Sequence, residues 1–317
     1  MARALKGVRA YQEAPRSDPL PLMPVIAEAH GAMLRDYGGE GPPVLFVPSL
    51  INPPNILDLS KEKSLLRWLA AKGHRVLLID WGWNSQARRS MNIADHVERI
   101  LLPLIREIGE PLALVGYCLG GTVALAAAQF ANVRSLATIA APWHFSGFST
   151  EARHMLTTLW ESSRATATAI GVLPMEVLQA AFWSLDPART VAKFEKFAEL
   201  DPRSEEAASF VTLEDWSNDG PPLPEAAARE MFDSFFRDDL IGKAAWQVAG
   251  KAITPPRDMP YLNIVSRTDR IVPHSTAAQA GERLDLDLGH VGMVVGGRAR
   301  ETLWEPLHTW LSRKASE

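Results

Sequence analysis

The stretch LALVGYCLGGTVALAAAQF, from Leu112 to Phe130, contains no charged residue and holds the only cysteine of the chain, Cys118. An uncharged run of this length could form a membrane-spanning helix. Three glycines, Gly116, Gly120 and Gly121, nevertheless lie close to the cysteine, and such a group is typical of a turn between two elements. We therefore expect a short buried strand over 112–115, a tight turn at Cys118, an alanine-rich helix over 119–130, and no membrane span.

Composition and charge narrow the class of protein. The chain has 317 residues, 47% of them hydrophobic, which suffices for one large domain or for a core with an insertion. Lys and Arg total 33 against 37 acidic residues, a net charge of -4, so binding to nucleic acid or to anionic lipid is not expected.

Several other classes of site have no support in the sequence. A single cysteine excludes intramolecular disulfides, and the start MARALKGVRAYQEAPR has no apolar stretch suited to a signal peptide, so a cytoplasmic location is expected. Neither a zinc-type Cys/His cluster nor a phosphate loop nor a GxGxxG pattern occurs. We expect no bound metal and no cofactor.

Strand and helix patterns alternate along most of the chain. The first forty residues give a weak pattern and are interpreted as a lead-in segment with short strands. Alternating strands and helices at the observed spacing predict an α/β fold with a mostly parallel sheet covered on both faces. The expected strands are 44–47 (VLFV), 75–80 (RVLLID), 112–115, 136–139 and 261–265, and the expected helices are 60–73, 92–108 with a bend at Pro103, 119–130 and 300–311.

Residues 146–245 break this alternation. They contain helical patterns and a PPLP turn at 221–224, without a convincing buried strand. We interpret them as an inserted helical cap, with a core formed by 1–145 and 246–317. Trp160, Trp183 and Trp216 lie in the cap; ordinary packing is expected for them, with the wall of a pocket as the alternative.

The turn at Cys118 matches a known catalytic arrangement. A strand that runs into GYCLGG and then into a helix is a nucleophile elbow, with cysteine where hydrolases usually carry serine in GxSxG. The elbow strains the backbone at the nucleophile, and a side chain at 116 or 120 would collide with the neighbouring strand or helix. The N-terminus of the following helix favours a thiolate at Cys118.

Chain order then predicts the partners of the nucleophile, because this fold places an acid after a late strand and a histidine near the end. Asp269 follows the strand at 261–265, and His290 lies in a loop before the last helix. The rival bases are His144 and His274, the rival acids are Asp285 and Asp287, and surface or capping roles are expected for His74, His96 and His308. An oxyanion hole is expected from the backbone amides of Leu119 and of Leu50 or Ile51.

Five segments in order resemble the polyhydroxyalkanoate synthase family, in particular its short catalytic-subunit type, within the α/β-hydrolase superfamily. They are LINPPNILDL (50–59), SLLRWLAAKGHRVLLIDWG (64–82), GYCLGG (116–121), TDRIVP (268–273) and GHVGMVVGG (289–297), and the resemblance extends through LEDWSNDGPPLP (213–224) and FFRDDLIGK (235–243). The chain departs from the family pattern at Arg270, where many relatives carry histidine, and at His144, where relatives usually have an acidic residue.

The resemblance implies an α/β-hydrolase fold and a cysteine acyltransferase. Cys118 would be the nucleophile, His290 the base and Asp269 the acid in the polymerisation of (R)-3-hydroxyacyl-coenzyme A, with an acyl-cysteine intermediate. The implied partners are the acyl-coenzyme A substrate, the growing polyester, and a second synthase subunit or a second copy of the chain, at polymer granules. The alternative is a cysteine esterase, thioesterase or intracellular polyester depolymerase with the same triad.

Overall fold

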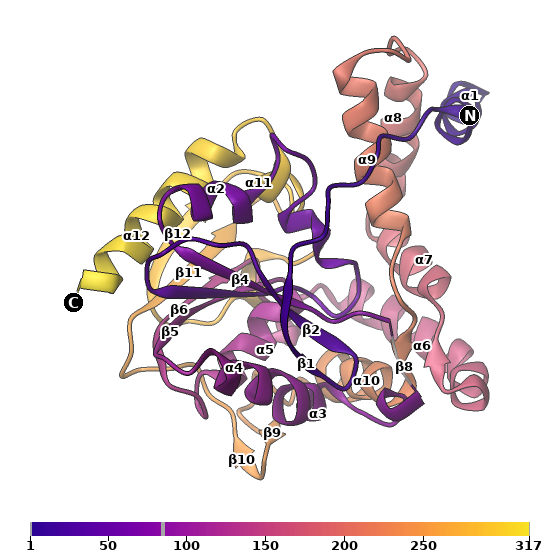
Figure 1. Ribbon diagram of the computed structural model, residues 1–317. Coiled ribbons are helices and arrows are strands. Elements are labelled where there is room, and N and C mark those ends of the chain that lie inside the picture. The colour runs from indigo at the N-terminus through magenta and orange to yellow at the C-terminus, as the bar shows by residue number, and fades with distance from the viewer. Residues whose placement is uncertain (1, 84–85, 317) are drawn as a thin grey trace.

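The computed structural model describes residues 2–83 and 86–316 and is organised around one eight-stranded sheet (Figure 1). The strand order is β1-β2-β4-β3-β5-β6-β11-β12. β2 pairs antiparallel with β1 and with β4, and all later neighbours are parallel. The strands span Val25–Ala29 (β1), Ala32–Asp36 (β2), Pro43–Val47 (β3), Arg75–Asp80 (β4), Leu112–Tyr117 (β5), Val133–Ile139 (β6), Tyr261–Ser266 (β11) and Glu282–Leu286 (β12).

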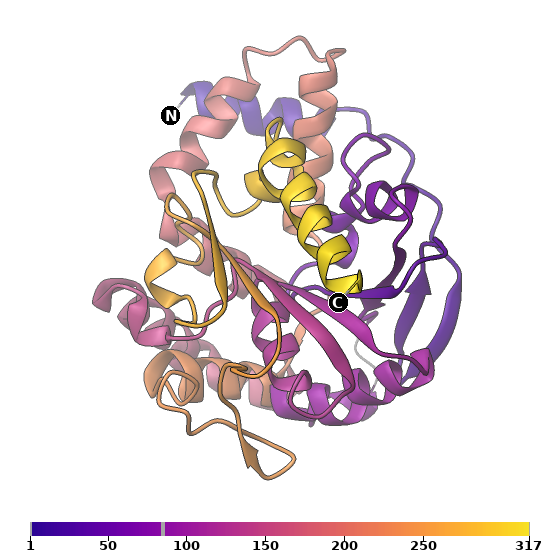
Figure 2. The same ribbon diagram turned by 90° about the vertical axis from the view of Figure 1, so that its left-hand side faces the viewer.

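Along the central strands, successive side chains point to opposite faces of the sheet, and apolar residues occupy both sets of positions. Both faces must therefore be covered. In β3, Leu45 and Val47 face one apolar cluster, whereas Val44 and Phe46 face the other, and all four are fully buried. Figure 2 shows the C-terminal helix in yellow on the side of the sheet opposite the magenta helices that follow β4 and β5. The predicted mostly parallel sheet with helices on both faces is confirmed.

The helices of the core flank these strands. They are η1 (Pro54–Leu57), α2 (Leu65–Ala71), η2 (Gln86–Arg88), α3 (Ile93–His96), η3 (Val97–Leu101), α4 (Leu102–Ile108), α5 (Leu119–Ala127), η4 (Phe145–Gly147), η6 (His274–Thr276), α11 (Gly292–Val295), η7 (Arg300–Trp304) and α12 (Glu305–Ser316). Two short strands, β9 (Gln247–Val248) and β10 (Lys251–Ala252), form a separate hairpin.

Two predicted core helices differ in detail from those observed. The helix expected over 60–73 begins only at Leu65, because the Ser64 hydroxyl accepts the amide of Arg67 and caps the first turn. The helix expected over 92–108 contains a π-helical segment, η3, before Pro103. Proline has no amide hydrogen to donate, and the local pattern of hydrogen bonds changes there.

The segment between β6 and β11 is mainly helical, and we call residues 150–237 the helical insert. It contains α6 (Thr150–Ile170), α7 (Met175–Leu185), α8 (Pro187–Phe197), α9 (Glu205–Asn218), α10 (Glu225–Arg229) and η5 (Glu230–Arg237), with the two-residue strands β7 (Val172–Leu173) and β8 (Leu223–Pro224) paired between them. The division of the chain at 146 and 245 stays a prediction.

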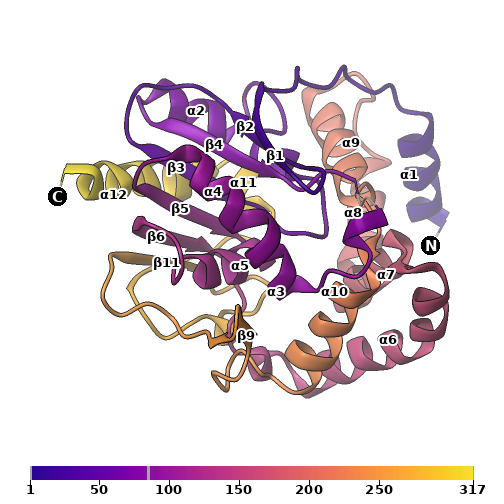
Figure 3. The ribbon, with the colours of Figure 1, turned by 60° about the horizontal axis from the view of Figure 1, so that its bottom comes forward.

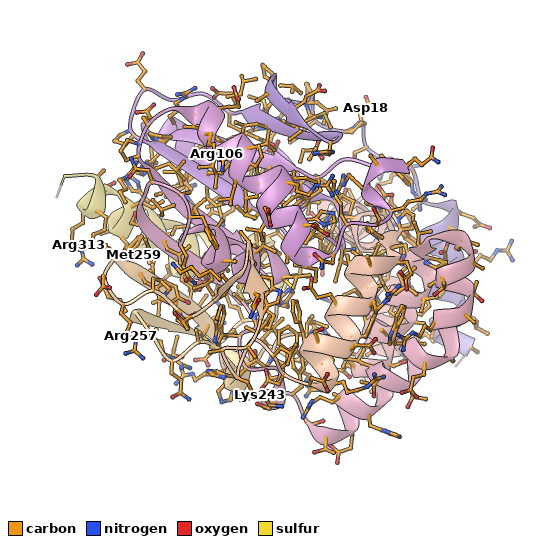
Figure 4. All side chains as sticks on the ribbon, turned by 90° about the horizontal axis from the view of Figure 1, so that it is seen from below. Asp18, Arg106, Lys243, Arg257, Met259 and Arg313 are labelled. Carbon is orange, nitrogen blue, oxygen red and sulfur yellow. The ribbon has the colours of Figure 1, made fainter. Side chains whose placement is uncertain are left out.

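The insert lies beside the carboxyl ends of the parallel strands. In Figure 4, Arg257 and Met259, which immediately precede β11, lie on the side of the molecule away from the insert helices. The loops that leave the carboxyl ends of β3, β5, β11 and β12 therefore face the insert.

The start of the chain differs from the sequence-based interpretation. Residues Ala2–Glu13 form a helix, α1, which packs against α8 of the insert (Figure 3). Gly7 makes this approach possible, because a Cβ there would lie 1.8 Å from the carbonyl oxygen of Phe194. The Tyr11 hydroxyl also donates to Asp215 of α9 at 2.6 Å. The expected short strands do occur, as β1 and β2.

The turn between β5 and α5 depends on backbones that approach more closely than side chains permit. A Cβ at Gly116 would lie 2.4 Å from the Cα of Gly121, and a Cβ at Gly120 would lie 2.2 Å from the carbonyl oxygen of Val47. The collision predicted for a side chain at 116 or 120 is confirmed. The strand and the helix touch without a side chain between them.

We expect Gly116→Ala to lower the free energy of unfolding by about 2 kcal/mol, because the added methyl group must push two backbone segments apart. Urea denaturation followed by circular dichroism measures this change. The control is Gly297→Ala, where no atom lies within 4 Å of the added Cβ. Equal stability of Gly116→Ala and the control variant would contradict the packing argument.

Candidate active site

Cys118 lies in a strained turn between the last residue of β5 and the first residue of α5. Its backbone has φ 56° and ψ -132°, in the half of conformational space that residues other than glycine avoid. Its amide donates to the carbonyl oxygen of Ile139 at 2.9 Å, and its carbonyl oxygen accepts the amide of Gly121 at 2.8 Å. These hydrogen bonds hold the turn and leave the thiol directed into a cavity that Cys118 lines.

The backbone donors expected for an oxyanion hole lie on two adjoining segments. Leu119 is the first residue of α5, where an amide has no acceptor within the helix. Gly120 has no side chain, and a Cβ at this residue would lie only 2.4 Å from the carbonyl oxygen of Pro48. The loop after β3 can therefore lie directly against the start of α5. The Ile51 amide donates to the Ser49 hydroxyl at 3.2 Å, which leaves Leu50 as the less engaged of the two loop candidates.

Asp269 and His290 form a buried pair beside this turn. Nδ1 of His290 lies 2.6 Å from Oδ2 of Asp269. The other carboxylate oxygen of Asp269 accepts the amides of Ile271 at 2.8 Å and Val272 at 3.0 Å, which fixes its orientation. Because Nδ1 faces the carboxylate, Nε2 is the ring nitrogen left to interact with the thiol of Cys118.

Adjacent strand ends explain why residues distant in sequence meet here. β11 and β12 pair in parallel, with Ser266 opposite Leu286. The Ser266 hydroxyl donates to the carbonyl oxygen of Leu288, which ties the end of β11 to the loop that carries His290. Asp269 and His290 therefore leave neighbouring carboxyl ends of the same sheet.

The charge on His290 depends on its two partners. Burial lowers the pKa of the His290 imidazole, but the negative charges of Asp269 and Cys118, together with the hydrogen bond to Asp269, outweigh this effect and raise the pKa to about 10. A free imidazole loses its proton near pH 6.5. As long as Asp269 and Cys118 carry negative charge, the imidazole of His290 stays protonated up to a pH of about 10.

Tyr117 is a member of the site that the sequence-based analysis did not identify. Its ring stacks on the His290 imidazole with 5.1 Å between centroids, and its hydroxyl donates to the His290 carbonyl oxygen at 3.2 Å. Tyr117 is the last residue of β5 and is buried. The only signal in the sequence is that Tyr117 directly precedes Cys118, and this does not predict a contact with His290.

The rival residues lie apart from Cys118 or are engaged elsewhere. His144 and His274 do not line the cavity, and Asp285 and Asp287 pair with Arg283 and Arg267. Of the surface or capping roles expected for His74, His96 and His308, a surface role is wrong for His74, which is buried against His308, and for His96, which is fully buried. Both lie in the packed interior, where burial lowers the pKa of each imidazole to about 4. The capping role stays a prediction.

The cavity at Cys118 has a volume of about 470 Å³ and lies between the core and the insert. Its walls are mainly apolar, with Leu119 and Phe145 from the core and Leu178, Phe182 and Phe232 from the insert. Trp183 and Trp216 also line it, whereas Trp160 is fully buried and stacks on Phe232. The packing expectation thus holds for Trp160, and the pocket alternative holds for the other two.

The described residues offer neither a metal site nor a membrane-spanning helix. Within 2–83 and 86–316, no group of three or more His, Cys, Asp or Glu side chains could hold a metal ion. No helix in the same ranges is long and apolar enough to cross a membrane.

We expect Asp269→Asn to lower the pKa of His290, because burial then acts without the opposing carboxylate charge. Cys118→Ala should lower it by less, since the charge of Asp269 remains. A pH titration of the imidazole by NMR in the wild type and both variants measures these shifts. An unchanged His290 pKa in both variants would contradict the assigned cause.

The chain is similar to known proteins over most of its length. Residues 44–302 match the alpha/beta hydrolase family. The chain is 27% identical over 314 residues to a poly(3-hydroxyalkanoate) polymerase subunit of Haloarcula marismortui, covering 94% of this chain and 66% of that protein. A polymerase subunit of Haloferax mediterranei is also 27% identical, over 86% of this chain and 59% of its own length. The chain thus spans about two thirds or less of these two relatives.

A further relative is matched over more of its length. The polymerase subunit of Thiocystis violacea is 25% identical, with 86% of this chain and 81% of that protein covered. The resemblance to polyhydroxyalkanoate synthases that the motifs indicated is confirmed by these matches.

Solved structures show the same fold. A lipase in an open form matches with a TM-score of 0.61 at 17% identity, covering 94% of this chain and all of that one. A non-heme bromoperoxidase-like protein, BpoC from Mycobacterium tuberculosis, matches with a TM-score of 0.54 at 17% identity, covering 92% of this chain and 98% of that one. Since the family match covers most of the chain, from residue 44 to residue 302, the chain belongs to the alpha/beta hydrolase family.

Proposed function

We propose that this chain is an acyltransferase that polymerises (R)-3-hydroxyacyl-coenzyme A into polyhydroxyalkanoate through an acyl-cysteine intermediate. The observation that carries the proposal is a thiol, rather than a hydroxyl, at the strained turn beside the His290–Asp269 pair. The similarity to three poly(3-hydroxyalkanoate) polymerase subunits over most of the chain supports the same reaction.

In the first half-reaction His290 takes the proton of Cys118, and the thiolate attacks the carbonyl carbon of the substrate thioester. The carbonyl oxygen becomes an oxyanion, which backbone amides at Leu119 and the loop after β3 would stabilise. The carbon–sulfur bond to coenzyme A then breaks, and the imidazolium returns its proton to the leaving thiolate. One thioester replaces another, so this exchange is nearly balanced in energy, which suits a thiol nucleophile better than serine.

In the second half-reaction the 3-hydroxyl of another acyl group attacks the acyl-cysteine. His290, oriented by Asp269, accepts the hydroxyl proton and passes it to the sulfur of Cys118 as that sulfur leaves. An ester bond forms, and the chain grows by one unit. The reaction contains no redox step.

Competition with water decides whether the acyl-cysteine is extended or hydrolysed. The mainly apolar wall of the cavity, with Leu119, Phe145 and Phe232, favours extension because it disfavours a bound water next to the thioester. A cysteine hydrolase remains the alternative that the products distinguish. We also propose that the chain works with a second synthase subunit or as a homodimer, consistent with relatives that are named as subunits.

The experiment that tests this proposal incubates the purified protein with (R)-3-hydroxybutyryl-coenzyme A. We expect release of the coenzyme A thiol together with oligoester, and loss of both in Cys118→Ala. Thiol release is followed with a thiol reagent, and chromatography separates oligoester from free 3-hydroxybutyrate. Free acid as the only product would contradict polymerisation and identify a thioesterase instead.

We expect Asp269→Asn to lower kcat by about 10² to 10⁴-fold, because the imidazole loses its orientation and the charge that stabilises its protonated form. The same thiol-release assay measures the change. Asp287→Asn is the matched control, since that exposed carboxylate pairs with Arg267 and lies outside the cavity. Similar losses in the two variants would argue against a role for Asp269 in the reaction.

A further inference from the structure

Two residues on the solvent-facing side of the cavity have no part in the reaction described above. Trp183 of α7 lines the cavity, yet 47% of its surface is exposed. Trp83 and Trp183 are the exposed tryptophans among the described residues, and of these two only Trp183 lines the cavity. An indole at the edge of an apolar cavity offers a flat apolar face that a bound ligand can cover.

Arg189 of α8 lies on the same side. Its guanidinium rests against the backbone of Gly289, with Nη1 3.4 Å from the position that a Cβ would take there. Gly289 immediately precedes His290, so this positive charge lies against the loop that carries His290. The side chain of Arg189 has no carboxylate partner among the described residues.

The carboxylates that line the same wall are already engaged. Asp186 caps α8 through the amide of Arg189 and accepts Nη1 of Arg270 at 2.8 Å. Glu214, which is buried, accepts Nζ of Lys193 at 2.7 Å. Arg189 thus contributes an uncompensated positive charge to a rim whose other charges are balanced.

We infer that Trp183 and Arg189 bind the nucleotide half of coenzyme A in the acyl donor, with the indole stacked on the adenine ring and the guanidinium bound to a phosphate. This inference rests on the proposed function, because it names how that site would hold its donor. An aromatic face is a sequence-independent platform for a base, and a guanidinium binds phosphate oxygens through paired N–H donors.

The nucleotide half fits these residues better than the acyl half. The acyl group is neutral and must reach Cys118, where Leu119 and Phe145 form an apolar wall. The nucleotide is anionic and can remain partly in water, as Trp183 and Arg189 do. Charge and exposure therefore divide the site into an apolar part for the acyl chain and a charged rim for the coenzyme.

Binding of coenzyme A itself tests the inference without any turnover. Isothermal titration calorimetry compares coenzyme A with pantetheine, which has no nucleotide and no phosphate, in the wild type, Arg189→Gln and Trp183→Ala. We expect each variant to bind coenzyme A about tenfold more weakly and to bind pantetheine as the wild type does. Arg189→Lys and Trp183→Phe should retain part of the affinity, because each keeps the charge or an aromatic ring.

The matched controls are Arg203→Gln and Trp83→Ala. Arg203 is exposed in the turn between α8 and α9, Trp83 is 69% exposed, and neither lines the cavity. Both control variants should bind coenzyme A as the wild type does. Circular dichroism spectra of all variants should coincide, since the substituted side chains are exposed.

Three results would overturn the inference: no binding of coenzyme A to the wild type, unchanged binding in Arg189→Gln and Trp183→Ala, or equal losses for coenzyme A and pantetheine. A different result separates it from the proposed function. If coenzyme A binding depends on both residues but no acyl-coenzyme A is turned over, the coenzyme site stands and the acyltransferase proposal fails.

Discussion

The close contact between the backbones of β5 and α5 is the constraint on which the rest of the site depends. Cys118 adopts a positive φ because the chain must reverse between a buried strand and a helix that touches it at Gly116 and Gly121. Gly120 extends the contact to the loop after β3. Two amide hydrogen bonds and three glycines thus hold in place a conformation that a cysteine would not adopt by itself.

The sheet then supplies the remaining groups by its topology. β3 and β6 flank β5, and β11 and β12 follow on the far side of β6, so five carboxyl ends open toward one cavity. Asp269 and His290 need no strain of their own, because adjacent parallel strands deliver them side by side. The buried ion pair is stabilised by the amides of Ile271 and Val272, which offset part of the cost of removing a carboxylate from water.

Much of this arrangement could be predicted from the sequence because its signals are local. The glycines around Cys118 and the apolar strands are patterns of neighbouring residues, and the order of Asp269 and His290 is linear. The strand β12 has only an intermediate and exposed burial pattern along most of its length, so it lacks a periodic signal. Helix α1 also has a weak apolar pattern in the sequence. Its position depends on contacts with α8, which the residues of α1 alone do not predict.

The residues that the sequence did not reveal are those whose roles arise from tertiary contacts. Tyr117 matters because His290 returns to stack on it from 173 positions further along the chain. Arg189 stands out only when the carboxylates around it are seen to be taken by Arg270 and Lys193. A ring contact between distant residues and a charge left without a partner both arise only when the chain has folded. No local sequence pattern predicts either of them.

The docking of α1 on the insert also has a consequence for how the chain is made. The ion pair between Arg3 and Glu199 joins residues 196 positions apart. At a synthesis rate of about 5–20 residues per second, α1 leaves the ribosome roughly 10–40 seconds before its partner helix exists. During that interval the face of α1 that carries Ala10 and Tyr11 has nothing to pack against. Helix α1 is therefore synthesised well before the segment on which it folds.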